Sequence, residues 1–407
     1  MSFEDIPFAR PFIGREEEEA ALRVLRSGWL TTGGEALAFE KEFAAFLQTV
    51  VNGNTPPPRG EGGYDTKKNN GLRCLAVNSA TSGLHLALEA CGVGPGDMVL
   101  VPSLTFTATA EVARYLGADP VFVDVAPGTF HIDPAALEET LERLPKGKAK
   151  AVMPVHYGGL PCDMNAVMDI ARRHGLKVIE DTAHSFPSLV GNSFAGTVGD
   201  VGVFSFYATK TITTGEGGML VTHDGEIAER VSIMRSHGID RSVWNRYSDT
   251  RASWYYEVVE AGYKYNLPDL LAAVGRVQLS RAWDFLRARE EIAAAYDTAF
   301  AGDDRFLLPP TGPGDARHLY PLRLNPRRIG VSRDTFIERL KATGIGVSVH
   351  FIPLHTMPFY KNRYQLAEED FPETMKSYRQ EISLPIWPGM TGEQVERVIA
   401  AVRTVHD

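Results

Sequence analysis

The stretch FSFYATKTITTGEGGML, residues Phe204–Leu220, places one lysine, Lys210, between an apolar run and a turn rich in Gly and Thr. The apolar run is typical of a buried β-strand, and Met219 and Leu220 begin the next apolar segment. After Lys210 the first acidic residue along the chain is Glu216. A lysine at the end of a buried strand therefore raises the question of its partner.

Working outward from this stretch, short apolar runs alternate with helical patterns. This alternation predicts βαβ units and a mostly parallel sheet. The apolar runs are RCLAV (73–77), DMVLV (97–101), PVFVDV (120–125), KAVMPV (150–155), KVIED (177–181) and VGVFSF (201–206).

The C-terminal part of the chain predicts a smaller α/β domain. A long helical stretch, from about Pro268 to Phe300, leads into strand HLYPLRL, helix SRDTFIERLKATG and strand GVSVHFI. A last helix follows Thr391, where Thr391 and Gln394 predict a capping box. We therefore expect a large domain at residues 1–285 and a small one at 286–407, with the N-terminal segment packing near the latter.

One segment does not fit the alternation. Residues 49–72, TVVNGNTPPPRGEGGYDTKKNNGL, are dense in Pro, Gly and Asn. This composition predicts a long mobile loop, inserted into the large domain.

Composition excludes several classes of protein. The net charge is -9, and 42 Lys and Arg are dispersed among 51 Asp and Glu, which argues against a nucleic-acid partner. The first twenty residues are acidic, and no apolar run approaches the length of about 20 residues of a membrane span, so we expect neither a signal peptide nor a membrane partner. Three cysteines without metal-ligand spacing predict free thiols, a cytoplasmic location and no bound metal.

Two further strand ends carry polar residues that suit a ligand. The turn Asn78–Gly83 opens a helix with small hydroxyl residues, which fits a phosphate and equally fits simple N-capping. Asp181 closes the strand KVIED, where a buried carboxylate needs a cation or donors; capping of a following helix is the alternative. His184 follows three residues later, near any ligand of Asp181 or as an ordinary polar residue.

Lys210 completes the set. A lysine that is partly shielded from water loses its proton readily and can form a Schiff base with a carbonyl carbon, although most lysines are simply solvated. Pyridoxal phosphate (PLP) needs a phosphate cradle, an Asp beside its ring nitrogen and a Lys for its aldehyde. The combination of the three strand ends predicts this cofactor, and an aldehyde would be the missing partner of Lys210.

Several motifs follow one another along the chain: SGWLTTGGEALAFEKEFAAFL, NSATSGLHLAL, VPSLTFTATA, VIEDTAHSF, FSFYATKTITTGEGGML, GYKYNLPDLLAAVGRVQL and SLPIWPGMT. Together they resemble the DegT/DnrJ/EryC1/StrS family of PLP-dependent nucleotide-sugar aminotransferases. The resemblance runs from about Pro11 to about Val405, with only residues 49–72 foreign to it.

The resemblance implies a fold-type-I α/β architecture, with helices on both faces of a mostly parallel sheet, and a homodimer with shared active sites. It implies that Lys210 is the catalytic lysine, that Asp181 pairs with the ring nitrogen and that His184 lies near the ring's 3-oxygen. It further implies that Phe106 stacks on the cofactor. The implied phosphate contacts are Thr81, Ser82, Ser205 and, from the partner subunit, Asn266. Thr182 departs from the alanine expected after the Asp.

The resemblance also implies the reaction. An amino donor, expected to be glutamate, and a keto-deoxy nucleotide sugar, UDP- or dTDP-linked and aminated at C4, would bind in turn in a ping-pong mechanism. Residues that fall where the family lines the sugar pocket are Trp29, Thr31, Tyr207 and His350, with His355 a further candidate.

Other activities fit parts of the sequence. Within the same family, relatives dehydrate sugars or make aminohydroxybenzoate; the deoxygenating branch replaces the lysine by histidine, which Lys210 disfavours. In another class, an NAD-dependent nucleotide-sugar oxidoreductase or epimerase would share the α/β pattern, but it should show GxGxxG after its first strand and none occurs. A sensor that has lost turnover is the third alternative.

Overall fold

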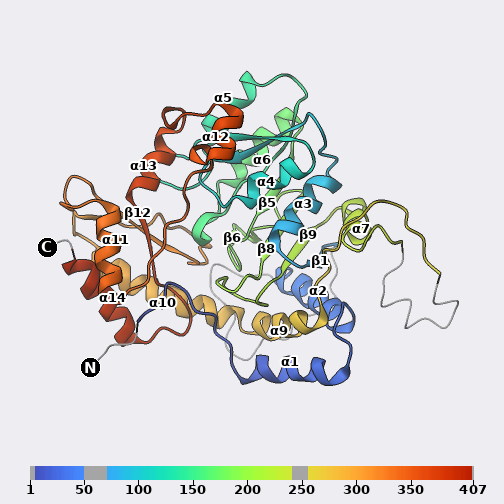
Figure 1. Cartoon of the computed structure of the whole chain (residues 1–407), viewed down its shortest axis with the longest axis horizontal. Coiled ribbons are helices and arrows are strands. Elements are labelled where there is room, and N and C mark those ends of the chain that lie inside the picture. The colour runs from blue at the N-terminus through green and yellow to red at the C-terminus, as the bar shows by residue number, and fades with distance from the viewer. Residues whose placement is uncertain (1–4, 50–70, 241–254, 406–407) are drawn as a thin grey trace.

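The structure is a computed structural model, and it describes residues 5–49, 71–240 and 255–405 (Figure 1). Within these residues a seven-stranded sheet forms the centre, in the order β1-β9-β8-β5-β4-β2-β3. Strand β9 is antiparallel to both of its neighbours, and the other neighbouring strands are parallel. The strands are β1 (Arg73–Val77), β2 (Met98–Pro102), β3 (Asp119–Val123), β4 (Ala149–Val152), β5 (Lys177–Asp181), β8 (Val201–Ser205) and β9 (Gly218–Thr222).

Side chains alternate along these strands between hydrophobic cores on the two faces. In β1, Leu75 and Val77 face one core, whereas Cys74 and Ala76 face the other. Helices cover both faces, which confirms the predicted α/β architecture. The first face carries α3 (Ala80–Ala90), α4 (Ala108–Tyr115) and α7 (Gly225–Met234), and the second carries α2 (Gly34–Leu47), α5 (Pro134–Arg143), α6 (Met164–His174) and α9 (Asp269–Ser280).

A second, antiparallel sheet has a core of its own. Its strands are β10 (Phe306–Leu307), β11 (Tyr320–Leu324) and β12 (Glu381–Leu384). This core also takes in Ile6, whose backbone bonds to Gly344 and Gly346. The helices that pack there are α11 (Arg333–Ala342), α14 (Gly392–Thr404) and the C-terminal half of α10 (Ala282–Phe300).

Helix α10 belongs to both parts of the molecule. Phe285 and Leu286 pack into the core against the large sheet, whereas Tyr296 and Phe300 pack into the core of the small sheet. The division of the chain near residue 285 stays a prediction. The remaining elements are α1 (Arg15–Ser27), η1 (Tyr157–Gly159), β6 (Leu189–Val190), β7 (Ser193–Phe194), η2 (Leu354–Thr356), α12 (Pro358–Tyr364), η3 (Glu368–Asp370) and α13 (Pro372–Gln380).

Local predictions in the C-terminal part had mixed outcomes. The capping box of Thr391 and Gln394 forms, with both reciprocal hydrogen bonds present. The strand predicted at GVSVHFI was wrong, because this segment pairs only at an isolated bridge between Ser348 and Ser383. The backbone N–H of His350 instead donates to Oε2 of the Glu381 carboxyl group, at 3.0 Å.

The remaining predictions concern the loop at residues 49–72, the cysteines, membrane spans and metal binding. The predicted loop at residues 49–72 lies almost wholly outside the described residues. All three cysteines are free thiols. Among the helices that the structure describes, none is long and apolar enough to cross a membrane. The described His, Cys, Asp and Glu residues form no group that could hold a metal ion.

The start of α3 lies unusually close to β9. A Cβ atom added at Gly218 would lie 2.8 Å from the amide nitrogen of Ala80 and 2.8 Å from the carbonyl carbon of Ser79. Both of these are backbone atoms, so relief would require the helix or the strand to move. Glycine at 218 therefore allows the first turn of α3 to lie against the start of β9.

We expect Gly218→Ala to destabilise the protein by about 1–3 kcal/mol, because its methyl group overlaps the backbone of α3. Gly225→Ala, at the exposed start of α7, is the matched control, since a Cβ there meets nothing within 4 Å. The control should stay within about 1 kcal/mol of the wild type. Urea unfolding followed by circular dichroism measures both, and equal midpoints for the two variants would contradict the close-contact explanation.

Candidate active site

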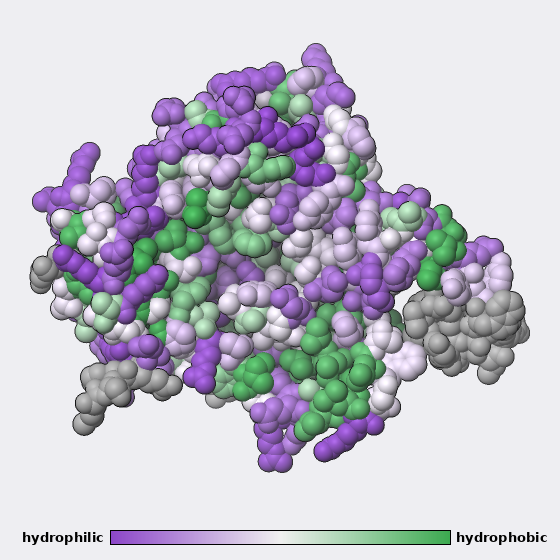
Figure 2. Space-filling view, viewed as in Figure 1, coloured by the Kyte–Doolittle hydropathy of each residue, from purple (hydrophilic) through white to green (hydrophobic). Residues whose placement is uncertain are grey.

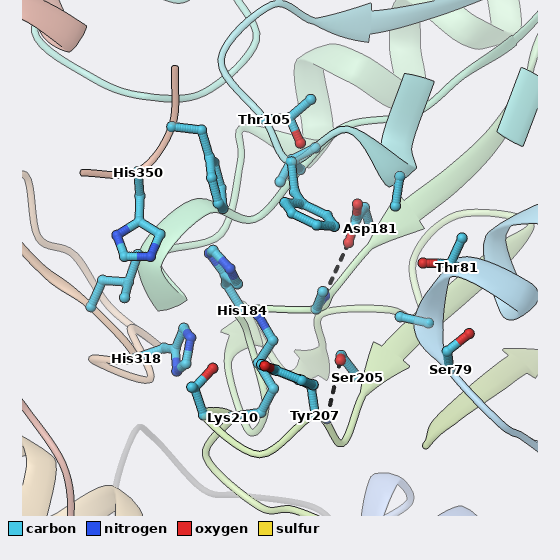
Figure 3. Close-up of a pocket in the computed structure, with 18 of the residues that line it drawn as sticks. Ser79, Thr81, Thr105, Asp181, His184, Ser205, Tyr207, Lys210, His318 and His350 are labelled. Carbon is cyan, nitrogen blue, oxygen red and sulfur yellow. Dashed lines mark hydrogen bonds between the residues drawn. The ribbon is translucent and has the colours of Figure 1, made fainter. Parts of the chain in front are cut away.

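A cavity of about 420 Å³ opens where the carboxyl ends of the central strands meet the small sheet. Figure 3 shows Ser79 and Thr81 on one side of this cavity and His318 and His350 on the opposite side. Asp181, His184 and Lys210 lie between them. The cavity is therefore built from segments far apart in the sequence.

Asp181 is a buried carboxylate at the end of β5. Its Oδ2 accepts a hydrogen bond from Thr109 Oγ1 at 2.8 Å, and its Oδ1 accepts one from the backbone N–H of Ala183 at 3.1 Å. Burial raises the pKa of Asp181, against the opposing effects of these donors and of Lys210. No helix follows Asp181, so the capping alternative does not apply. The carboxylate keeps one side toward the cavity, where a cationic ligand would stabilise its charge.

Lys210 lies in the turn between β8 and β9, and its backbone N–H bonds to the carbonyl of Tyr207 at 2.9 Å. Burial lowers the pKa of Lys210 to about 8, while the charge of Asp181 acts to raise it. Within the described residues the Lys210 ammonium makes no hydrogen bond or ion pair, and the charge of Asp181 acts on it from a distance. A substantial fraction of this lysine is therefore neutral at slightly alkaline pH and able to act as a nucleophile.

The N-terminus of α3 forms another wall. Ser79 caps this helix by accepting from the N–H of Ser82 at 3.1 Å. Ala80 and Thr81, in the first turn, line the cavity, and their N–H groups have no intrahelical acceptor. Ser205, at the end of β8, lies on the same wall. Free N–H groups at a helix N-terminus together with hydroxyl groups suit a phosphate.

Three histidines also line the cavity, together with phenylalanine side chains, and His318 and His350 lie on the side opposite α3. The ring centroids of His184 and His318 are 4.7 Å apart, and those of His184 and His350 are 6.2 Å apart. Burial and the charge of Lys210 hold the pKa of His184 well below its usual range, and they lower that of His350 to about 3. Burial likewise holds the pKa of His318 well below its usual range, so all three rings are neutral at physiological pH. Phe106 is 56% exposed, with its ring 5.8 Å from that of Phe351.

The structure brings most of the predicted site residues to this one cavity. Those that line it are Thr81, Phe106, Asp181, His184, Ser205, Tyr207, Lys210 and His350. Four others do not line it: Trp29, Thr31, Ser82 and Asn266. Ser82 is buried, and its hydroxyl donates to the carbonyl of Ser79 at 2.7 Å, so Ser79 takes its place on the cavity wall. His355 is buried elsewhere, with its Nδ1 2.5 Å from Ser103 Oγ.

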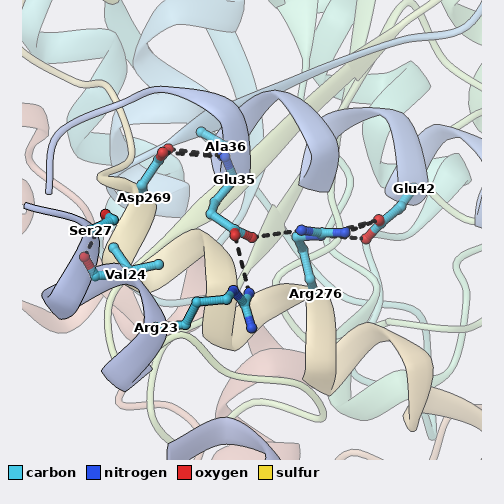
Figure 4. A network of polar contacts seen from close by, with 8 residues as sticks. All are labelled: Arg23, Val24, Ser27, Glu35, Ala36, Glu42, Asp269 and Arg276. Carbon is cyan, nitrogen blue, oxygen red and sulfur yellow. Dashed lines mark hydrogen bonds and ion pairs between the residues drawn. The ribbon is translucent and has the colours of Figure 1, made fainter. Parts of the chain in front are cut away.

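Trp29, Thr31 and Asn266 lie together in a separate network. Asn266 donates to Thr32 Oγ1 at 2.6 Å, and Asp269 accepts from the N–H groups of Gly33 and Ala36 at 2.7 and 3.0 Å. Figure 4 shows Asp269 bonded to the start of α2 near the ion pairs of Arg276. The segment GWLTTG is thereby fixed to the segment YKYN, and Trp29, Thr31 and Asn266 do not line this chain's own cavity.

Sequence reasoning missed several residues that line the cavity or lie directly behind its wall. Thr109 is buried behind the wall and orients Asp181, and Thr105, which lines the cavity, lies 2.8 Å from Thr109 in the same hydroxyl chain. Their spacing, one turn apart at the start of α4, was a signal available in the motif LTFTAT. His318 had no such local signal, because it stands before the ordinary apolar strand β11.

Comparison with known proteins agrees with this geometry. The model of the DegT/DnrJ/EryC1/StrS aminotransferase family matches residues 69–403. The chain belongs to this family. The spore coat polysaccharide biosynthesis protein SpsC of Bacillus subtilis is 43% identical over 404 residues, which cover 98% of this chain and 97% of SpsC.

Solved structures of aminotransferases share the fold. Spr1654 of Streptococcus pneumoniae, assigned as a sugar aminotransferase and solved in a PLP form, is 29% identical with a TM-score of 0.84 over 99% of this chain and 98% of its own. PseC of Helicobacter pylori, an aminotransferase of pseudoaminic acid biosynthesis, is 28% identical with a TM-score of 0.85 over 99% of both chains. The chain is an aminotransferase of a PLP-dependent family, which decides against the oxidoreductase alternative.

The lowered pKa of Lys210 predicts how the cofactor-free protein captures PLP. Only the neutral amine attacks an aldehyde, so the capture rate should rise about tenfold per pH unit up to pH ~8 and level off above it. Stopped-flow absorbance between pH 6.5 and 9.5 measures this rate. Nα-acetyl-lysine is the reference for the cofactor's own titration, and its rate should keep rising through the whole range. A Lys210 profile parallel to that of the reference would contradict the pKa shift.

Proposed function

We propose that this aminotransferase moves an amino group from glutamate to the 4-keto group of a UDP- or dTDP-linked deoxy sugar, the two substrates binding in turn. The observation that carries the proposal is that Lys210 and Asp181 face one cavity whose far wall is a free helix N-terminus. Two relatives support the sugar as acceptor, since SpsC is named for polysaccharide biosynthesis and PseC for pseudoaminic acid biosynthesis.

The cavity residues fit PLP one by one. The free N–H groups of α3, with the hydroxyls of Thr81 and Ser205, would hold its phosphate. Asp181 would pair with its ring nitrogen, which needs a fixed anion, and Phe106 would stack on its ring. His184 would lie near its 3-oxygen. When bound, PLP supplies an electron sink for the carbon from which a proton is removed.

The proton transfers and the contacts to the sugar would be made by the chain's own side chains. Lys210 is the one described lysine that lines the cavity, so it would take the proton from the amino-donor carbon and return one to the sugar carbon. Tyr207 and His350 line the outer part of the same cavity and would contact the sugar. The neutral state of the surrounding histidines leaves Lys210 as the cavity-lining group whose pKa is shifted to about 8.

We further propose that the site is completed by a second copy of the chain. Asn266, Trp29 and Thr31 lie on one surface, fixed together by the Asp269 network, and they would reach the partner's cavity. Apolar side chains gather over α1 beside this network, where Leu22, Leu25 and Leu30 are exposed (Figure 2). An exposed patch of this kind is typical of an interface between subunits.

The first half-reaction has a direct spectroscopic test. Wild-type protein with PLP should show a visible absorbance band that glutamate converts to a band at shorter wavelength, and Lys210→Ala should show neither change. Lys146→Ala, at an exposed position, is the matched control and should behave like the wild type. Absence of the visible band in the wild type would contradict the proposed site.

The second half-reaction separates the proposal from its alternatives within the family. The glutamate-treated protein, freed of glutamate, should return to its original spectrum on addition of a 4-keto nucleotide sugar, with one amino sugar formed per site. Release of a dehydrated sugar without an amino group would instead indicate the dehydratase alternative.

Subunit mixing tests the shared site. Lys210→Ala and Asn266→Ala should each be inactive alone, because each lacks one part of every site. In a refolded equimolar mixture about a quarter of the sites combine an intact Lys210 with the partner's intact Asn266, so about a quarter of wild-type activity should return. A mixture as inactive as its components would contradict a partner role for Asn266.

A further inference from the structure

A buried carboxyl group lies behind the histidine wall of the cavity and plays no part in the reaction proposed above. Glu381, the first residue of β12, is fully buried, as is Ser383 two residues later. Two residues apart on one strand, their side chains point to the same face. Ser383 Oγ is hydrogen-bonded to Glu381 Oε1, and it also lies 2.8 Å from His350 Nδ1. A continuous chain of hydrogen bonds therefore runs from Glu381 through Ser383 to a ring that lines the cavity.

The chain can hold its protons in two opposite arrangements. Glu381 Oε2 accepts the backbone N–H of His350 at 3.0 Å, which favours Oε1, the oxygen bonded to Ser383, as the site of a proton on the carboxyl group. When Glu381 is ionised, Ser383 donates to it, and His350 Nδ1–H donates to Ser383. When Glu381 is protonated, both bonds reverse, and His350 Nδ1 becomes an acceptor.

The other ring nitrogen of His350 then takes the opposite role. Nε2 has no hydrogen-bond partner among the residues that the structure describes, and the ring lines the cavity. In a neutral imidazole one nitrogen donates and the other accepts. Nε2 is therefore an acceptor while Glu381 is ionised and an N–H donor while Glu381 is protonated.

We propose that Glu381 is a positioning residue, which sets through Ser383 whether His350 offers the bound sugar a hydrogen-bond donor or an acceptor. This inference rests on the proposed function for the nature of the ligand, a keto or hydroxyl oxygen of the sugar. A keto oxygen accepts only, so the donor state is the one that binds it.

The surroundings favour the donor state at neutral pH. Burial raises the pKa of Glu381 to about 8, against the lowering effects of Ser383, the His350 backbone N–H and Arg333. Arg323 stands opposite Glu381 in the sheet register, but its guanidinium lies 5.8 Å from the centre of the Phe130 ring. Neither arginine forms an ion pair with Glu381 in the described residues. Tyr157, whose hydroxyl bonds to the His350 carbonyl, is also neutral, because burial raises its pKa.

The charged and titratable groups on the cavity side do not alter this assignment. Lys210, His184 and His318 face the His350 ring, and burial, with the charge of Lys210 as a smaller cause, lowers the pKa of His350 to about 3. His350 thus stays neutral from pH 6 to pH 9, and a change at its ring in this range is a change of tautomer. Because the pKa of Glu381 is raised, the carboxyl keeps its proton below pH ~8 and loses it above.

Nitrogen-15 NMR of histidine-labelled, PLP-loaded enzyme tests the relay directly, since the two nitrogens of a neutral imidazole have distinct shifts. His350→Gln assigns the signal. The wild type should change from Nε2–H to Nδ1–H as the pH rises from 6.5 to 9.5. Glu381→Gln should remain Nε2–H throughout, because the amide can donate to Ser383 and still accept from the His350 backbone. A single tautomer throughout in the wild type, or the same switch in Glu381→Gln, would overturn the proposal.

Kinetics test the effect on the ligand. Ser383→Ala breaks the chain and should raise the KM for the keto sugar about tenfold, with the KM for glutamate and the first half-reaction unchanged. Ser348→Ala, opposite Ser383 at the isolated bridge, is the matched control and should leave both KM values unchanged. Equal effects of Ser383→Ala on both substrates would overturn the substrate role.

The two proposals fail separately. The tautomer is read without any sugar, so a switching His350 in an enzyme that aminates no keto sugar would support the relay and overturn the proposed function. Conversely, an active sugar aminotransferase whose His350 does not switch would overturn the relay alone. Thermal unfolding of each variant, expected within a few degrees of the wild type for Glu381→Gln, confirms that the fold is retained.

Discussion

The burial of a carboxylate at the end of β5 is the constraint on which the cavity depends. A charge removed from water must be met by donors, and the chain supplies Thr109 from α4 and the backbone N–H of Ala183. These two bonds fix α4 and the segment after β5 relative to each other. The side of Asp181 that faces the cavity then determines where a cationic group can bind. Lys210 lies near enough for the charge of Asp181 to raise its pKa.

The preceding residue meets the same constraint on the opposite face of the sheet. Glu180 is fully buried and accepts N–H groups from Gly196, Val198 and Gly199, besides its bond to His156 at 2.9 Å. Because side chains alternate along a strand, β5 holds one carboxylate inside the protein framework and presents the next one to the ligand. The framework bonds of Glu180 hold the strand end that carries Asp181.

Much of the fold could be predicted, because hydrophobic alternation and strand-end chemistry are local properties of the sequence. Asp181 and Lys210 stood out because a charged residue at the end of an apolar run is unusual wherever it occurs. The strand predicted at GVSVHFI failed for a non-local reason, since the N–H of His350 bonds to a side chain from β12. His318 and the Glu381 chain could not be found either, because their roles arise only when the small sheet meets the large one.

Helix α10 gives the molecule a rigidity that its sequence does not predict. Nineteen residues of continuous helix, about 28 Å long, have one end in each hydrophobic core. A helix shared in this way resists rotation of the small sheet relative to the large one, because such a rotation must pull side chains of the helix out of a packed core. The width of the cavity between Lys210 and His350 is then fixed by the fold, and an acceptor is selected by whether it fits this width.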